Sequence, residues 1–290
     1  NARYLPRFQQ ISEKYGCIPV WLTNYEIAID PVYIEFVKDA IARATAEIGM
    51  HLHAWNSPPT DRLTDDGWRY KPYLIEYSDA AMRAKVDYMT RLLEETFQTK
   101  MVSHRAGRWA FDERYAHLLV EYGYLVDCSV TPRVNWKTAK GAPQGDGGSD
   151  YRHFPQHAYF LDENDIRREG QSPLLEVPMS IQYKHSAWMN SLKQGYDRLR
   201  GKVRSPSVHW LRPMGGNVET MKKVVEQTLA QGNDYVEYML HSSEYMPGGS
   251  PTFKNEQDIE RLYADLESFF SWLAPQVKGM TLAEYYQTKI

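Results

Sequence analysis

The order of the predicted secondary structure constrains this chain more than any single motif does. Short runs that read as strands alternate with amphipathic helices, and the expected strands fall at 18–22, 49–55, 100–104, 124–128, 174–178, 209–212 and 235–241. Because a strand, a helix and a further strand form the repeating unit of a parallel sheet, this order predicts an α/β fold. We expect one barrel-like domain over residues 1–290, with an open doubly wound sheet as the alternative.

Local signals indicate where several of the helices begin. Asp30, Ser78 and Asp112 are of types that cap helix N-termini, and each precedes apolar residues at helical spacing. Glycines and prolines break the rhythm over 131–172, which predicts an irregular insertion lying over one face. The expected helices are 4–15, Asp30 to near Gly49, Ser78 through Phe97, Asp112 to Gly123, Asn217 to Gly232, Asn255 to Pro275, 281–287 and, in the ambiguous segment 180–207, one around 187–200.

Composition excludes several classes of partner. The formal net charge is −3, whereas a nucleic-acid-binding protein needs a basic surface, so no nucleic-acid partner is expected. No apolar run approaches the roughly 18 residues of a membrane span. The only two cysteines, Cys17 and Cys128, indicate no disulfide framework and favour a reducing, cytoplasmic location. The aromatic content of 13% serves a large core and leaves rings for sugar stacking.

His51 and His53 form the most specific local pattern. They lie two residues apart at the end of an apolar run, and side chains at positions i and i+2 of a strand point to the same side. Two converging imidazoles suit a divalent metal such as zinc. A hydrogen-bonded pair without metal is the alternative interpretation.

Polar residues also follow the other predicted strands. In parallel β/α folds the active site forms at the C-terminal ends of the strands, so polar side chains there are candidate site residues. Each of them also has an ordinary structural explanation, such as a surface ion pair or a capped turn. Their joint placement on one face predicts a metal-assisted or acid/base hydrolytic site. The set comprises His51, His53, Arg105, Asp127, Glu176, Arg212 and His241.

Five short motifs occur in an order that resembles one known family. They are Glu47-Ile-Gly-Met-His51, Arg105-Ala-Gly-Arg-Trp109, Gly123-Tyr-Leu-Val-Asp-Cys-Ser129, Leu175-Glu-Val-Pro178 and Leu240-His-Ser-Ser-Glu244. In this order and spacing the chain, from about 4 to 285, resembles the polysaccharide deacetylase superfamily (NodB-like, carbohydrate esterase family 4). It is most similar to the WalW-like branch linked to lipopolysaccharide and O-antigen biosynthesis.

The resemblance implies a distorted (β/α)7 barrel and a hydrolase that removes N-acetyl groups from a sugar. It implies a divalent metal, usually zinc, held by His51 and by His53. His241 is then the general acid, Arg105 holds the carboxylate base, and Leu240 packs against the acetyl methyl group. The remaining candidate substrate-binding residues are Arg108, Trp55, Trp109 and Asp127.

The sequence departs from the family pattern in three respects. The family's first motif, an Asp pair on the first strand that supplies the base and a metal ligand, is absent, so we expect a further strand upstream of Asn1. Most members have His-x-x-x-His, but here Trp55 stands at the fourth position after His51. Arg108 replaces a tyrosine of the arginine loop, which indicates an acidic sugar or a site that no longer deacetylates.

Two further hypotheses stand beside the metal-dependent deacetylase. One is a metal-free amidohydrolase on the same scaffold, which chelators would not inhibit. The other is a non-catalytic sugar-binding protein of the polysaccharide pathway, whose glycan binding would survive His241→Ala.

Overall fold

The computed structural model describes residues 1–185, Met189 and 207–290, so the helix expected around 187–200 lies almost wholly outside the described residues. The main sheet has the strand order β1-β2-β3-β4-β7-β5-β6. The first five strands in this order run parallel, whereas β5 is antiparallel to both β7 and β6. The strands are β1 Val20–Thr23, β2 Glu47–Leu52, β3 Ser103–Ala106, β4 Val126–Asp127, β5 Tyr159–Asp162, β6 Asp165–Glu169 and β7 Leu175–Glu176, with β8 Ile181–Tyr183 and β9 Val208–Trp210 paired separately.

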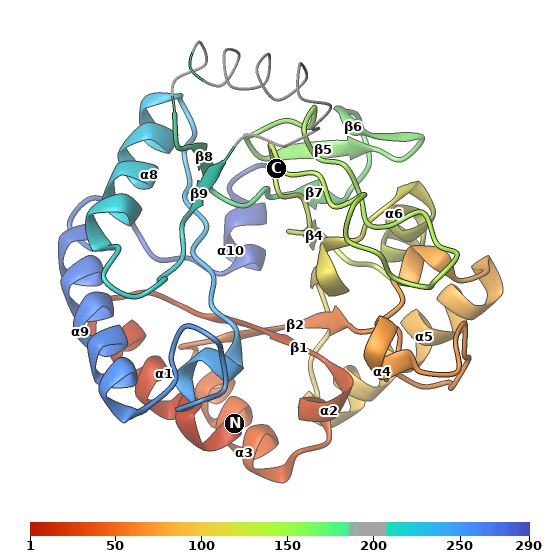
Figure 1. Cartoon of the computed structure of the whole chain (residues 1–290), viewed down its shortest axis with the longest axis horizontal. Coiled ribbons are helices and arrows are strands. Elements are labelled where there is room, and N and C mark those ends of the chain that lie inside the picture. Colours follow the sequence, from red (N-terminus) through yellow and green to blue (C-terminus); the bar gives the residue numbers. More distant parts are fainter. Residues whose placement is uncertain (186–188, 190–206) are drawn as a thin grey trace.

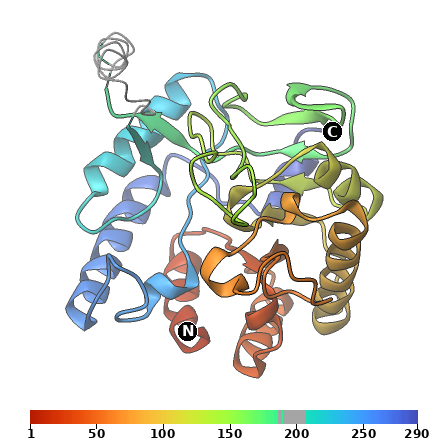
Figure 2. The same ribbon diagram turned by 45° about the vertical axis from the view of Figure 1, so that its right-hand side comes forward.

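Helices surround these strands, as an α/β barrel requires. In Figures 1 and 2 the long helices lie at the periphery, and α10 lies within the ring that they form. This arrangement confirms the predicted distorted barrel. The helices are α1 Leu5–Lys14, α2 Tyr25–Ala28, α3 Pro31–Ala42, α4 Gly67–Tyr70, α5 Asp79–Phe97, α6 Glu113–Glu121, α8 Val218–Ala230, α9 Glu256–Leu273 and α10 Leu282–Gln287.

The predicted caps account for several helix starts. The side chain of Asp30 accepts from Val32 N, Ser78 caps α5 and Asp112 caps α6. Each cap satisfies a backbone N–H that lacks a partner in the first turn, which stabilises the helix by about 1 kcal/mol. Asn217 makes no such cap to α8 and instead donates to Arg212 O, so it braces the preceding turn.

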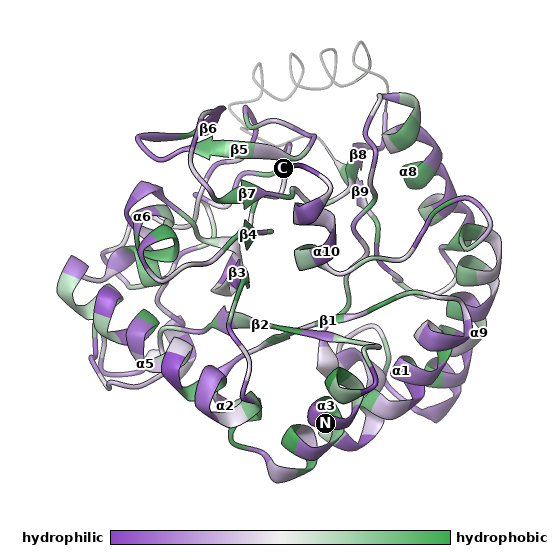
Figure 3. Ribbon diagram, turned by 180° about the vertical axis from the view of Figure 1, so that it is seen from behind, coloured by the Kyte–Doolittle hydropathy of each residue, from purple (hydrophilic) through white to green (hydrophobic). Residues whose placement is uncertain are grey.

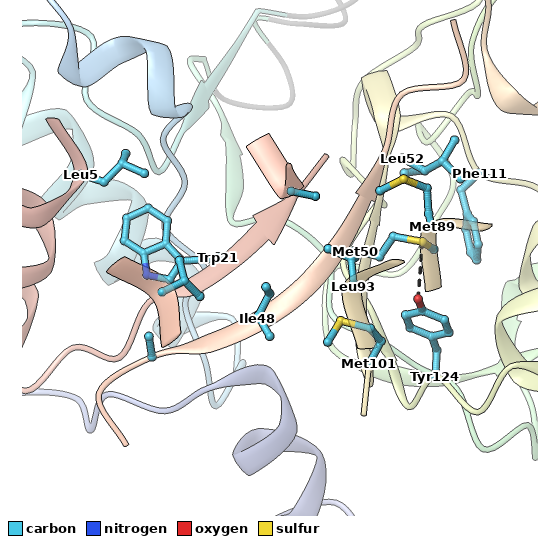
Figure 4. Packing of buried hydrophobic residues seen from close by; sticks show 14 of the residues in the cluster. Leu5, Trp21, Ile48, Met50, Leu52, Met89, Leu93, Met101, Phe111 and Tyr124 are labelled. Carbon is cyan, nitrogen blue, oxygen red and sulfur yellow. Dashed lines mark hydrogen bonds between the residues drawn. The ribbon is translucent and has the colours of Figure 1, made fainter. Parts of the chain in front are cut away.

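The space between helices and strands is filled by large apolar side chains. Figure 3 shows that the peripheral helices carry both hydrophilic and hydrophobic residues, and the apolar ones pack inward. Around β2, Met50 lies among Met89, Leu93, Met101 and Tyr124, all fully or almost fully buried (Figure 4). Burying one such side chain contributes about 1.5–3 kcal/mol.

Three expectations about local structure are wrong. Helix α3 ends at Ala42 rather than near Gly49, because Ala44 turns the chain with a φ of 55° and β2 begins at Glu47. The run 235–241 is not a strand, because its backbone bonds go singly to Ser180 Oγ and Leu211 O instead of forming a ladder. The insertion is less irregular than predicted, since it contains β5 and β6.

Other expectations agree with the structure. Cys17 and Cys128 are both free thiols. Among the described residues no helix has the length and apolar character needed to cross a bilayer. Strand β1 pairs with β2 and is the first strand of the sheet order. A further strand beyond β1 stays a prediction.

Candidate functional site

Strands β2 and β3 bring His51 and Arg105 together. The two residues are register partners in this parallel pair, so their side chains project to the same face. The imidazole of His51 is also fixed, because its Nδ1 lies 2.8 Å from the carbonyl oxygen of Arg105. A carbonyl can only accept, so Nδ1 carries the proton and Nε2 presents a free lone pair.

His53 completes a chain of hydrogen bonds with His51. The Nε2 atoms of the two rings are 3.0 Å apart, and Asn24 Nδ2 lies 3.3 Å from His53 Nδ1. Asn24 Oδ1 accepts from Ile27 N as the cap of α2, which leaves the amide N–H₂ to face the ring. His53 therefore accepts at Nδ1 and donates from Nε2 to His51 Nε2. This assignment follows from the hydrogen-bond network.

Both imidazoles are neutral at physiological pH. Burial lowers the pKa of His51 well below its usual value, and the neighbouring His53 lowers it further. Burial lowers the pKa of His53 to about 4, with contributions from the positive charges of His241, Lys71 and Arg108. His241, the predicted general acid, therefore contributes to the electrostatic environment of His53.

The histidine pair fits two ligand positions of a divalent metal. Neutral imidazoles are the ligating form, and a carbonyl that orients the opposite ring nitrogen, as at His51, is typical around metal-binding histidines. Nitrogen ligands of a tetrahedral zinc lie about 3.4 Å apart, close to the 3.0 Å between the two Nε2 atoms. Among the residues that the structure describes, no group of three or more His, Cys, Asp or Glu side chains could hold a metal.

Packing on both sides of the ring holds His53 in place. Trp55 stacks on it, with ring centroids 4.4 Å apart and an interplanar angle of 16°. On the β3 side, Gly107 lies so close that a Cβ there would be 2.2 Å from Leu52 O and 3.0 Å from the ring of His53. Only glycine allows this approach. Trp55 thus orients a histidine, whereas contact between Trp55 and substrate stays a prediction.

The turn after β3 has an uncommon backbone. Arg108 and Trp109 both have positive φ, 55° and 63°, although neither is glycine. Such conformations cost of order 1–3 kcal/mol and cluster at functional sites. The strain places the Trp109 ring 4.8 Å from the guanidinium of Arg105.

Arg108 ties two surface segments together. Its guanidinium donates to Lys71 O at 2.5 Å and to Lys140 O at 3.1 Å. Lys71 belongs to the loop over 55–77 and Lys140 to the insertion over 131–172, so one side chain binds both. A role of Arg108 in recognising an acidic sugar stays a prediction.

Arg105 forms an ion pair that the sequence patterns did not indicate. Its Nη2 donates to Glu237 Oε1, and the side chains of Arg105 and Glu237 are only 11% and 12% exposed. The predicted function of Arg105, holding a carboxylate, thus has a partner within the described residues. Glu237 lies 132 positions away in a run that lacks regular pairing, so no local motif could have identified it.

His241 is oriented by a second carboxylate. Its Nδ1 lies 3.1 Å from Glu244 Oε2, and Glu244 Oε1 in turn accepts from Arg212 at 2.6 Å. Burial would raise the pKa of Glu244, but hydrogen bonding to His241 and the charge of Arg212 hold it below its usual value. The side chain of His241 is 55% exposed, so Nε2 is available to a substrate. Arg212, predicted at the rim, therefore acts through Glu244.

Asp127 lies outside the mouth, the group formed by His51, His53, Arg105 and His241, and its predicted contact with substrate stays a prediction. The residue is 0% exposed and accepts from His104 Nδ1 at 2.5 Å. His104 also bonds Tyr115 of α6 through Nε2, at 2.6 Å, so this network faces the helix layer. Glu176 is the register partner of Asp127 and is equally buried, which also removes it from the mouth.

Leu240 and His241 lie on different sides of their segment. Tyr238 packs on Phe269 and Phe270 of α9, with ring centroids 6.2 and 5.4 Å apart. In an extended run Leu240 shares that side, and it packs against the same apolar cluster as Tyr238. The structure therefore does not place Leu240 with His241, and its contact with an acetyl group stays a prediction.

Comparisons with known proteins support the fold. No family model matches the chain, and no curated protein matches it. A crystal structure from Mycobacterium smegmatis, of a protein provisionally named a polysaccharide deacetylase, aligns over 99% of this chain and 77% of its own, with a TM-score of 0.57 and 18% identity. A 4-alpha-glucanotransferase from Thermococcus litoralis aligns over 98% of this chain and 36% of its own, with a TM-score of 0.49 and 14% identity.

The first likeness, at 18% identity, defines the class of the fold and nothing finer. The chain is a distorted parallel α/β barrel with polar residues gathered at the ends of its strands. Its activity has to be argued from those residues.

Proposed function

We propose that this chain is a hydrolase that removes the acetyl group from an acetamido sugar of a surface polysaccharide. The observation that carries the proposal is the exposed His241, which the buried Glu244 orients and whose electrostatic effect reaches His53. A histidine that a carboxylate orients through Nδ1 can donate a proton from Nε2. This geometry suits protonation of the amine that leaves when an amide is cleaved.

Other residues of the mouth position a carboxylate, offer ligands for a metal and provide an aromatic surface. Arg105 positions a carboxylate by a charge-assisted hydrogen bond. The neutral rings of His51 and His53 are the groups that would hold a divalent metal, and zinc suits such nitrogen ligands. A metal bound there supplies Lewis-acid polarisation of the amide carbonyl. The ring of Trp109, over Arg105, supplies an aromatic face at the edge of the mouth.

The finer assignment rests on two similarities. The motif order resembles the polysaccharide deacetylase superfamily, and the fold matches a Mycobacterium smegmatis protein provisionally named for that activity. A place in lipopolysaccharide or O-antigen biosynthesis, a WalW-like relationship and a cytoplasmic location are part of the proposal. The pathway and the WalW-like relationship rest on the sequence resemblance, and the location rests on the two cysteines.

The test compares two histidines that differ in location but hardly in environment. His241→Ala is expected to lower acetate release from penta-N-acetylchitopentaose or UDP-N-acetylglucosamine by about 100- to 10,000-fold. His117 is the matched control, because it is 53% exposed and pairs with Glu163 at 2.9 Å, but on the outer helix α6. Equal rates for His117→Ala and His241→Ala would contradict the proposal.

One observation favours a metal-free amidohydrolase as the second candidate. The hydrogen bond from His53 Nε2 to His51 Nε2 already satisfies both nitrogens that a metal would occupy. The two candidates are separated by dialysis of the full chain against a chelator. Loss of turnover that added Zn²⁺ restores supports the metal-dependent deacetylase, and unchanged turnover supports the metal-free enzyme.

A further inference from the structure

Glu237 lies on the side of its segment that faces the interior of the barrel and Arg105. Tyr235 and Glu237 alternate with Tyr238, whose ring packs outward against α9. Tyr235 instead packs on Tyr285 of α10, the helix inside the ring, with ring centroids 5.4 Å apart. The backbone of Glu237 is fixed by a hydrogen bond from its N–H to Ser180 Oγ at 2.9 Å.

The ion pair with Arg105 brings Glu237 to the histidine pair. Arg105 is the register partner of His51, and its positive charge contributes to the lowered pKa of that histidine. The guanidinium donates to Glu237 Oε1. The Arg105 side chain therefore links this carboxylate to the face of β2 and β3 that carries His51.

One oxygen of Glu237 has no partner. Oε2 is buried and forms no hydrogen bond among the described residues, although Oε1 is paired. An unsatisfied buried carboxylate oxygen costs free energy unless something else bonds to it. A proton taken from water or a bound water molecule satisfies it.

From this placement we infer that Glu237 is the carboxylate base of the site. The inference rests on the proposed hydrolysis. Glu237 takes a proton from water, the hydroxide oxygen forms a bond to the acetamide carbon, and the C–N bond then breaks as His241 protonates the departing nitrogen. The products are acetic acid and the free amine; Glu237 returns its proton to solvent and His241 takes one up, so both side chains regain their starting states.

The electrostatic surroundings agree with this function. Burial raises the pKa of Glu237 to about 7, against the lowering effects of Arg105 and Cys128, and the charge of Asp127 adds to the rise. A base is most effective when its pKa lies near the working pH. The charge of Glu237 in turn contributes to the raised pKa of Glu176 on β7.

The first experiment is a substitution that keeps the shape of the site. Glu237→Gln still bonds Arg105 but cannot accept the proton, so acetate release from penta-N-acetylchitopentaose is expected to fall by about 100- to 10,000-fold with unchanged thermal stability. Glu237→Asp is expected to retain part of the rate. Glu47→Gln, a change of a partly buried glutamate at the start of β2 that accepts from Ala283 N at 2.9 Å, is expected to stay within about threefold of wild type.

A second measurement does not depend on turnover. In the full chain labelled with ¹³C at glutamate carboxyl carbons, one signal is expected to titrate near pH 7 and to vanish in Glu237→Gln. The same group is expected to set the acid limb of the kcat/KM profile.

The outcomes separate the two proposals. Full activity in Glu237→Gln, with His241→Ala inactive, overturns the base assignment and leaves the hydrolase intact. A stability loss in Glu237→Gln without a change in rate per folded molecule assigns Glu237 a structural role and also overturns the inference. A wild-type chain that hydrolyses neither probe overturns both.

Discussion

His104 and Arg105 are consecutive residues of β3, yet they belong to two different polar networks. His104 faces α6, where Asp127 and Tyr115 occupy both of its ring nitrogens. Arg105 faces the opposite way, toward His51 and Glu237. Both networks combine a cation or imidazole with a carboxylate, and both lie largely out of water.

The difference lies in whether the carboxylate oxygens of Asp127 and Glu237 have hydrogen-bond partners. Asp127 accepts from His104, from Ser129 Oγ at 2.8 Å and from Ser129 N at 3.0 Å, and it has no exposed surface. The Arg105 network keeps some exposed surface and an unpartnered oxygen on Glu237. A saturated buried network stabilises the fold, whereas an unsaturated one at a surface opening has capacity left for chemistry.

The largest effect should come from breaking the saturated network. Asp127→Ala leaves His104 and two donors of Ser129 buried without their acceptor, and we expect the free energy of unfolding to fall by about 3–5 kcal/mol. Urea denaturation followed by circular dichroism measures this. A loss below about 1 kcal/mol, within the range of an exposed ion pair, would contradict the structural assignment.

A steric change at the mouth should have the next largest effect. Gly107→Ala places a Cβ 2.2 Å from Leu52 O, so the turn must move away from His53, and we expect a loss of about 1–3 kcal/mol together with weaker metal binding. Gly67→Ala is the matched control, because its new Cβ would lie at least 3.6 Å from its neighbours. Similar stabilities for both variants would show that the turn tolerates displacement.

Replacing Asn24, the hydrogen-bond partner of His53 Nδ1, tests whether His53 is a metal ligand. Asn24→Asp keeps a capping oxygen for α2 but offers His53 Nδ1 an acceptor, which favours the tautomer with a free Nε2. We expect Zn²⁺ affinity to rise by about tenfold, as carboxylate–histidine pairs strengthen metal sites. Competition with a chelating dye measures the affinity. Weaker binding would indicate that His53 is not a ligand.

The smallest effect at mildly acidic pH should come from Glu176. Burial and the charge of Asp127 raise its pKa well above the usual value, so its contribution is complete below about pH 4.3 and is lost as the pH rises through the folded-state value. In Glu176→Gln this loss is absent. We expect both proteins to differ by less than about 1 kcal/mol at pH 5 and the variant to gain relative stability toward alkaline pH.

The pH dependence of unfolding, measured with urea at intervals between pH 5 and 9, decides this prediction. A difference between the two proteins that stays constant would show that Glu176 is already ionised. Asp127 acts in the opposite direction, because His104 holds its pKa below the usual value despite burial, so its contribution is lost only as the pH falls.

Local signals predicted much of the fold and only part of the site. Caps such as Ser78 and Asp112 act within one turn of chain, so sequence identifies them directly. The two residues of β4, in contrast, are buried on both faces, and nothing in their pattern tells which face Asp127 takes. Glu237 required knowledge of a contact with Arg105 that only the folded chain creates.

The turn at Arg108 and Trp109 has a mechanical consequence. Arg108 donates hydrogen bonds to the loop over 55–77 and to the insertion. The ring of the next residue, Trp109, packs on the guanidinium of Arg105, which pairs with Glu237. A displacement of that loop or of the insertion is transmitted through one peptide unit to Trp109 and to the Arg105–Glu237 ion pair in the mouth. We therefore expect an insertion of another length to change the environment of Glu237 as well as the range of substrates that fit the mouth.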